Sequence, residues 1–150
     1  MGDVDLFACA DFWRDLKELR KHIKKSFVDC PFSEEDFEKL SCMEKISCIP
    51  ILYSISTAIK NKLDKLHEIR NNERNGQQPF LEKEFVLWKL RWAVDRNGAR
   101  YGLRITYLIR GNKVVFAAIK RKKDIADDER DFQTLTKERL KVFLTVNFNE

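Results

Sequence analysis

A regular alternation of apolar and polar residues between positions 85 and 119 constrains the fold more than any other feature of the sequence. The run FVLWKLRWAV, which begins at Phe85, places both of its tryptophans on one face of an extended strand and Lys89 and Arg91 on the other. This follows because successive side chains of a strand point to opposite faces. The pattern predicts a half-buried strand with one apolar face and one cationic face.

Two more strands are predicted to follow, joined by short turns. The pair Asn97-Gly98 tolerates the positive φ of tight hairpin turns, and the next run, YGLRITYLI, alternates again and carries Arg104 near its centre. A second turn at residues 110–113 leads into VVFAAI, whose nearly continuous apolar character is typical of a central strand. The sequence therefore predicts a three-stranded meander.

Positive charge is concentrated on this meander. From Leu81 to Lys123 there are twelve Lys and Arg residues and three Asp and Glu residues, a net charge of +9, whereas the whole chain carries +5. Segregated charge of this kind suits a polyanion such as a nucleic acid. A solvated surface is the alternative, but Arg104 argues against it, because an arginine among apolar strand residues is harder to explain by solvation than one in a loop.

One strand and several helices are predicted outside the meander. The segment VDLFACA, from Val4, reads as a short strand that adds to the sheet. Asp11 is the expected N-cap of an amphipathic helix, FWRDLKELRKHIKK, whose Lys and Arg residues are interpreted as a solvated face in preference to a nucleic-acid contact. Ser33 with Asp36 resembles a capping box before a short helix, and Pro50 suits the first turn of a helix that reaches about Asn71.

The remaining segments are a loop and a last helix. Residues 71–79 are polar and rich in turn formers, which predicts a loop or partial linker. After the cluster Lys120–Lys123, Asp124 and Asp127 suit the start of a helix. Its apolar positions are Phe132, Leu135, Leu140 and Phe143.

The cysteines and histidines match no known site pattern. The four cysteines contain no Cys-x-x-Cys pair, and reduced, buried thiols are expected. A zinc site of Cys30, Cys42 and Cys48 with His22 or His67 is the alternative, although the spacings match no zinc-ligand pattern. Both histidines fall in helical patterns and are interpreted as helix-surface or boundary residues.

Length and hydropathy suit one folded domain over residues 1–150, with an extended helical segment at about 26–78. No run approaches the roughly 18 apolar residues of a membrane span. The N-terminus is acidic where a signal peptide is basic. We therefore expect a cytoplasmic protein without a membrane partner.

The run KLRWAVDRNGARYGLRITYLI, followed by VVFAAIKRKKDIADDE, resembles the C-terminal half of the RelE/HigB superfamily of bacterial type II toxins. One branch of that family has a basic strand ending in Arg-Trp, a glycine-rich turn, an Arg-x-x-Tyr strand, an apolar strand, and a lysine followed by acids. The corresponding segments are Lys89 to Trp92, Gly98 to Gly102, Arg104 to Tyr107, Val114 to Ile119, and Lys123 to Glu129. The N-terminal strand and helix also fit the family order, whereas residues 26–78 do not match.

The resemblance implies a RelE-like α+β fold. An antiparallel sheet, made of the N-terminal strand and the C-terminal meander, would pack against N-terminal helices and be followed by a C-terminal helix. The implied activity is that of an mRNA interferase, an endoribonuclease that inhibits translation by cleaving mRNA on the ribosome through attack of the 2′-hydroxyl. It needs no metal or cofactor, and its expected partners are the ribosome, mRNA and a cognate antitoxin protein.

The resemblance also implies site residues. By motif position, Arg104 corresponds to the strand arginine that contacts the scissile phosphate, and Lys89 and Arg91 correspond to the preceding basic pair. Arg121 is the nearest counterpart of a second phosphate-binding arginine. These four are the predicted catalytic residues, and further RNA contacts are expected from Arg100, Lys120, Lys122 and Lys123.

The chain departs from the family pattern at three positions. Many members carry a Tyr, His or acidic residue after the last strand, where it stacks on the base or moves a proton, whereas this chain offers Asp124 and no aromatic residue there, so the acid that protonates the departing oxygen is unassigned. Tyr101 replaces a common glycine, and Ala126 replaces a Ser or Thr. A related branch poisons DNA gyrase by protein contact. The alternative function is therefore a non-catalytic protein that binds RNA, or a protein target such as gyrase, through its basic sheet.

Overall fold

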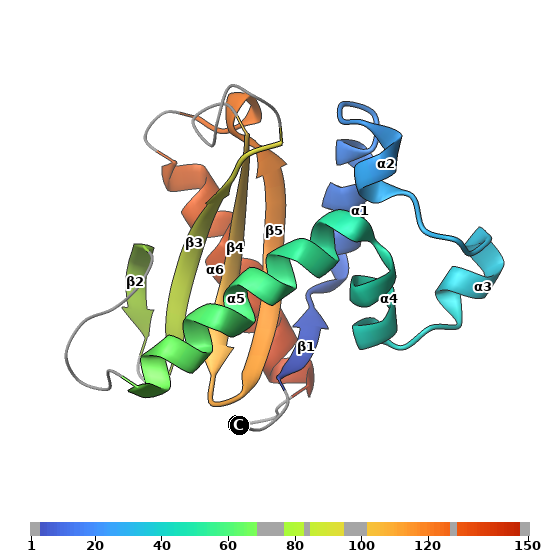
Figure 1. Cartoon of the computed structure of the whole chain (residues 1–150). Helices are drawn as coiled ribbons and strands as arrows, with labels where there is room; N and C mark the ends of the chain where they lie inside the picture. The colour runs from blue at the N-terminus through green and yellow to red at the C-terminus, as the bar shows by residue number, and fades with distance from the viewer. Residues whose placement is uncertain (1–3, 69–76, 83–84, 95–101, 127–128, 148–150) are drawn as a thin grey trace.

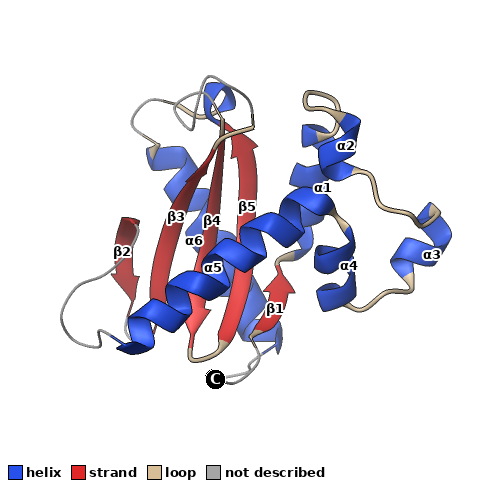
Figure 2. Cartoon of the chain, viewed as in Figure 1, coloured by secondary structure: helices blue, strands red, loops and turns tan. Residues whose placement is uncertain are grey.

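The computed structural model describes residues 4–68, 77–82, 85–94, 102–126 and 129–147, which form an α+β fold. A five-stranded sheet has helices on both faces: α5 crosses one face and α6 lies behind the other (Figures 1 and 2). In chain order the elements are β1 (Asp5–Ala8), α1 (Ala10–Leu19), α2 (Lys25–Val28), α3 (Glu34–Glu38), α4 (Cys42–Cys48), α5 (Pro50–Glu68), β2 (Gln77–Glu82), β3 (Phe85–Trp92), β4 (Leu103–Arg110), β5 (Lys113–Arg121), the 3-10 helix η2 (Lys122–Asp124) and α6 (Arg130–Asn147).

The predicted meander is confirmed, but the prediction of an antiparallel sheet throughout is wrong. The strand order is β1-β5-β4-β3-β2; β3, β4 and β5 pair antiparallel, whereas β1 pairs parallel with β5. Alternation in a short segment such as VDLFACA indicates a strand but says nothing of its direction. Here the direction is set by the crossover from β1 through the helices into the sheet.

The edge strand β2 was not predicted. Residues 71–79 were expected to form a loop or linker, yet β2 begins at Gln77 and pairs antiparallel with β3, with a register irregularity between Gln77 and Phe80. A strand at the edge of a sheet tolerates proline and polar residues, because one of its sides makes no ladder hydrogen bonds. Its sequence therefore resembles that of a loop.

The two faces of the sheet are covered by different helices. On one face the buried side chains of Ile105 and Phe116 pack with Phe12 of α1 and with Ile55 and Ile59 of α5. The extended helical segment thus supplies a cover for the sheet through α5. On the other face a second cluster joins the sheet to α6, and it includes Leu87, Leu108, Val115 and Leu140.

A β-bulge in β5 changes which side chains share a face. Tyr107 is opposite Phe116, whereas Thr106 is opposite Ala118, so Ala117 is the extra residue. Beyond such an insertion the alternation of side chains is reversed. Ala118 and Lys120 therefore lie on the α6 face, and Arg121 does not.

Some of the predicted helix boundaries are confirmed and others are wrong. Ser33 caps α3 by accepting a hydrogen bond from the Asp36 amide, at 3.1 Å, and α5 begins at Pro50 as predicted. By contrast, α1 is capped at Cys9 and not at Asp11, and it ends at Leu19. The predicted continuation through HIKK is wrong, because residues 20–24 form a turn before α2.

The hairpin between β3 and β4 requires glycine at position 102. An ideal Cβ on Gly102 would lie 2.1 Å from the carbonyl oxygen of Trp92, so the main chain must move to admit one. We expect Gly102→Ala to lower the free energy of unfolding, measured by urea denaturation, by about 1–3 kcal/mol. Gly111→Ala is the control: Gly111 has open space around it but a φ of +61°, and should cost about 1 kcal/mol. Equal stability of Gly102→Ala and the wild type would contradict this close approach.

Within the described residues no single helix has both the length and the hydropathy to cross a bilayer. The bent pair formed by α4 and the first part of α5, with a 107° bend, passes that test by length and composition alone.

Candidate nucleic-acid interface

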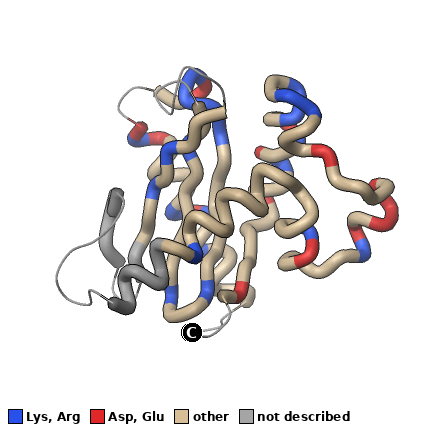
Figure 3. Tube along the Cα trace, viewed as in Figure 1, with Lys and Arg blue, Asp and Glu red and all other residues tan. Residues whose placement is uncertain are grey.

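Three cations occupy neighbouring positions across three strands. Arg91 of β3 is opposite Arg104 of β4, and Arg104 is opposite Lys120 of β5. Directly opposed residues of neighbouring strands point to the same face, so these three side chains, which we call the cationic row, start from the α6 side of the sheet. Figure 3 shows Lys and Arg gathered at the end of the sheet where β5 ends.

Arg104 is the buried member of the cationic row. It is only 2% exposed, and its Nη1 donates a hydrogen bond to the Leu103 carbonyl oxygen at 3.1 Å. Burial lowers the pKa of its guanidinium, Arg91 lowers it further, and Glu129 acts in the opposite direction. The surroundings therefore disfavour the positive charge that Arg104 carries at neutral pH.

Lys89 lies two residues before Arg91 in β3, on the same face of the sheet. It forms an ion pair with Glu129, which lies in the turn before α6. Its Nζ donates a hydrogen bond to Glu129 Oε1 at 3.1 Å, and both side chains are 12% exposed. Glu129 has a φ of 55°, a left-handed conformation that is uncommon for a residue other than glycine. A strained residue thus supplies a carboxylate to the cationic end of the sheet.

Lys120 is connected to a buried network centred on Asp15 of α1. The Asp15 carboxylate accepts hydrogen bonds from the Ile119 amide at 3.1 Å, from Lys120 Nζ at 3.3 Å, and from Arg139 of α6 at 2.6 and 3.1 Å. Arg139 also donates to the Ala117 carbonyl oxygen, at the bulge, at 2.9 Å. Asp15 therefore joins α1, β5 and α6 at one point.

The sequence contained a signal for this network that was not used. The helical pattern places Asp15 on the charged side of its helix, although Asp15 is three residues after Phe12 and four before Leu19. An acidic residue at this spacing borders the apolar stripe of the helix and so lies close to the core. Arg139 and Glu129 were also missed, and for these the sequence has no clear signal, because their partners are distant in the chain.

Arg121 lies apart from the other predicted catalytic residues. It is opposite Leu103, so it starts from the α1 and α5 side of the sheet. Its guanidinium donates two hydrogen bonds to the Asp124 carboxylate, at 2.8 and 3.2 Å, and these lower the pKa of Asp124. Among the predicted RNA contacts, Lys122 and Lys123 lie in η2, and Arg100 falls outside the described residues.

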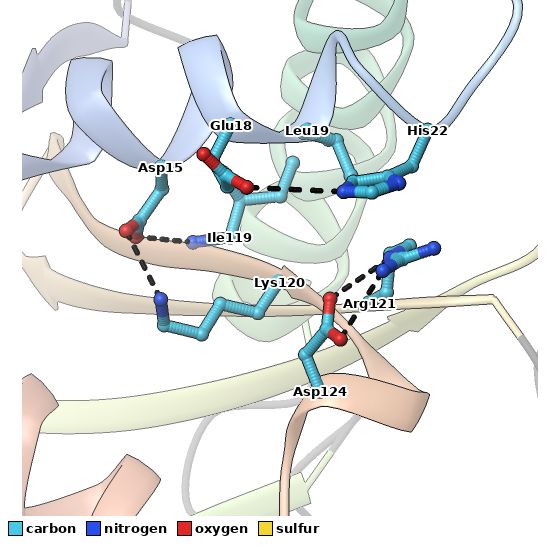
Figure 4. Close-up of a pocket in the computed structure, with 8 residues that line it drawn as sticks. All are labelled: Asp15, Glu18, Leu19, His22, Ile119, Lys120, Arg121 and Asp124. Carbon is cyan, nitrogen blue, oxygen red and sulfur yellow. Dashed lines mark hydrogen bonds and ion pairs between the residues drawn. The ribbon is translucent and has the colours of Figure 1, made fainter.

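A cavity of about 180 Å³ lies between the end of α1 and the end of β5. Figure 4 shows Asp15, Glu18 and His22 on the α1 side and Lys120, Arg121 and Asp124 on the β5 side. His22 belongs to the turn after α1, and its Nε2 lies 3.8 Å from Glu18 Oε1. Since Lys120 lines the cavity and is also opposite Arg104, the cavity adjoins the cationic row.

The side chains that could bind a metal are dispersed. Among the described residues, no three His, Cys, Asp or Glu side chains lie close enough together to hold a metal ion. The four cysteines are free thiols, and burial raises the pKa of Cys9 to about 12. Within the described part, the cationic row and the adjoining cavity are thus the strongest candidates for a site.

Comparisons with known protein families, curated proteins and solved structures find no match for this chain. Its function is therefore inferred from the chemistry of the site and from the motif resemblance alone. An end of a sheet with several arginines and lysines is suited to bind phosphate groups.

Proposed function

We propose that this chain is the toxin of a type II toxin-antitoxin system, a RelE-like endoribonuclease that acts in the cytoplasm and cleaves mRNA on the ribosome. The cationic row is the observation that supports this proposal best. Like charges directly opposite one another destabilise a sheet. Such a local cost is usually kept where function requires it, and an RNA phosphate would remove the repulsion on binding.

The proposed chemistry is metal-independent attack of a ribose 2′-hydroxyl on the adjacent phosphate. Arg91 and Arg104 would stabilise the charge that develops on the phosphorane, and Lys120 would add to the same field. Lys89 would contact the neighbouring phosphate, for which Glu129 competes in the structure. RNA binding would therefore displace Glu129 from Lys89 and open access to the buried Arg104.

An antitoxin is the proposed protein partner. A segment that covers the basic end of the sheet would exclude RNA from it, and an acidic segment would suit its charge best. Removal of the antitoxin would then expose the cationic row to the ribosome and its mRNA.

A non-catalytic binding protein is the second candidate, and the surroundings of Arg104 and Lys89 favour it. Arg104 is 2% exposed and Lys89 is held by Glu129, as expected of residues that support the fold. In that case RNA, or a protein target such as DNA gyrase, would contact the exposed cations. Binding would fall gradually as charges are removed, whereas an enzyme loses activity abruptly when one catalytic group is changed.

The proposal predicts that expression of this chain alone in a bacterium arrests growth and translation. Lys89→Ala should remove the arrest, since Lys89 is placed at the phosphate, and Lys60→Ala, an exposed lysine of α5, should leave it intact. Growth curves and incorporation of a labelled amino acid measure both effects. Unchanged growth and translation with well-expressed wild-type protein would show that the toxin proposal is wrong.

A further inference from the structure

His22 lines the cavity between α1 and β5 together with Lys120, a member of the cationic row. The His22 amide donates to the Leu19 carbonyl oxygen at 2.9 Å, which holds the residue in the turn that ends α1. Its side chain is 34% exposed, so a bound molecule can reach the imidazole. In Figure 4 the imidazole lies across the cavity from the Arg121 guanidinium.

The carboxylates around His22 are paired with cations. Asp124 is held by Arg121, Glu18 lies 3.1 Å from Lys21 Nζ, and Asp15 is held by Lys120 and Arg139. These pairs reduce the repulsion that three acids would otherwise exert on a phosphate. The charged groups that line the cavity with His22 are therefore Asp15 and Glu18 from α1, Lys120 and Arg121 from β5, and Asp124 from η2.

Basic residues continue on both sides of the cavity. On one side the exposed Lys24 and Lys25 lie at the start of α2, and on the other Lys122 and Lys123 extend from the end of β5. An RNA backbone that crosses the cavity could therefore contact lysines before and after it.

We propose that His22 is the proton-transfer residue of the cleavage reaction, an inference that rests on the proposed nuclease function. The neutral imidazole accepts the proton of the ribose 2′-hydroxyl as the 2′ oxygen forms its bond to phosphorus. The bond between phosphorus and the 5′ oxygen breaks, and the 5′ oxygen takes a proton from solvent, to which His22 later returns its own. The products are a 2′,3′-cyclic phosphate and a 5′-hydroxyl, with no change in oxidation state.

His22 would supply proton transfer, a role that the Arg and Lys residues of the strands do not fill. Arginine and lysine stay protonated at neutral pH and stabilise charge well, whereas histidine is the side chain that most readily accepts and releases a proton there. Lys120 links the two parts, because it lines the same cavity as His22 and is opposite Arg104 in the sheet. The scissile phosphate would lie near Lys120.

The test uses the purified full chain and a labelled mRNA bound to programmed ribosomes. Single-turnover cleavage rates are measured across the neutral pH range for the wild type, for His22→Gln and for His67→Gln, the other histidine of the chain, and for His22→Ala with and without added imidazole. Binding to the same ribosomes is measured separately, and circular dichroism checks that each variant is folded.

We expect His22→Gln to cleave about 100-fold more slowly or worse, with ribosome binding unchanged, and His67→Gln to match the wild type. The pH profile of the cleavage rate should differ between the wild type and His22→Gln. Added imidazole should restore part of the rate of His22→Ala, which it would not do for a residue with only a structural role. Cleavage by His22→Gln at the wild-type rate and with the same pH profile would overturn the assignment and leave the proposed function standing. A wild type that binds ribosomes without cleaving mRNA would instead overturn the nuclease function, and this inference with it.

Discussion

Replacement of Asp15 by alanine is expected to lower the free energy of unfolding by about 3–5 kcal/mol, the typical cost of removing one partner of a buried ion pair. The Asp15 side chain is 4% exposed and that of Arg139 is 10% exposed, so the substitution leaves a buried guanidinium without its carboxylate. It also removes the acceptor of the Ile119 amide, which lies on β5 beyond the last residue paired with β1. Urea denaturation measures the loss.

Two further variants test whether the loss of stability comes from the Asp15 network or from any substitution in α1. Asp11→Ala removes a half-exposed acid of the same helix, 3.6 Å from Arg14, and should change stability by less than about 1 kcal/mol. Adding Arg139→Met to Asp15→Ala should restore part of the loss, because it removes the uncompensated charge. Equal stability of Asp15→Ala and Asp11→Ala would contradict a structural role for Asp15.

Replacement of Arg104 by methionine should reduce mRNA cleavage by about 100-fold or more, the usual effect of removing a group that stabilises transition-state charge. Stability should be maintained, because methionine fills a similar volume and the surroundings already disfavour the charged guanidinium. The measurement pairs cleavage rates with urea denaturation. Arg110→Met, at the opposite end of β4, is the matched control and should cleave normally. Loss of cleavage together with loss of folding would assign Arg104 to the fold and not to the reaction.

The sequence predicted elements whose signals are local. Alternation was sufficient for β3, β4 and β5, and Ser33 and Pro50 marked helix starts correctly, whereas the predicted Asn97-Gly98 turn lies outside the described residues. What could not be predicted depends on contacts between distant segments. The parallel direction of β1 and the pairing of β2 follow from how the chain crosses the sheet, and α1 ends at Leu19 although its helical pattern continues.

The candidate site also depends on a feature that the sequence does not reveal, the β-bulge at Ala117. Alternation places Lys89 and Arg91 on one face of their strand, and the structure has them there, with Arg104 of β4 opposite Arg91 on the same face. Uninterrupted alternation from Phe116 would add Arg121 to that face, but the extra residue places Lys120 there and turns Arg121 toward the cavity with His22. A run of apolar residues such as VVFAAI contains no sign of a bulge, so this exchange could not be read from the sequence.

The most direct test of the central claim maps the 5′ ends of cellular transcripts after the chain is expressed alone in a bacterium. The wild type and Arg104→Met are compared at equal protein levels. A ribosome-dependent nuclease that uses the cationic row predicts new 5′ ends, in register with the reading frame, inside translated messages with the wild type and none with Arg104→Met. Growth arrest with intact messages, or the same cuts with both proteins, would contradict it.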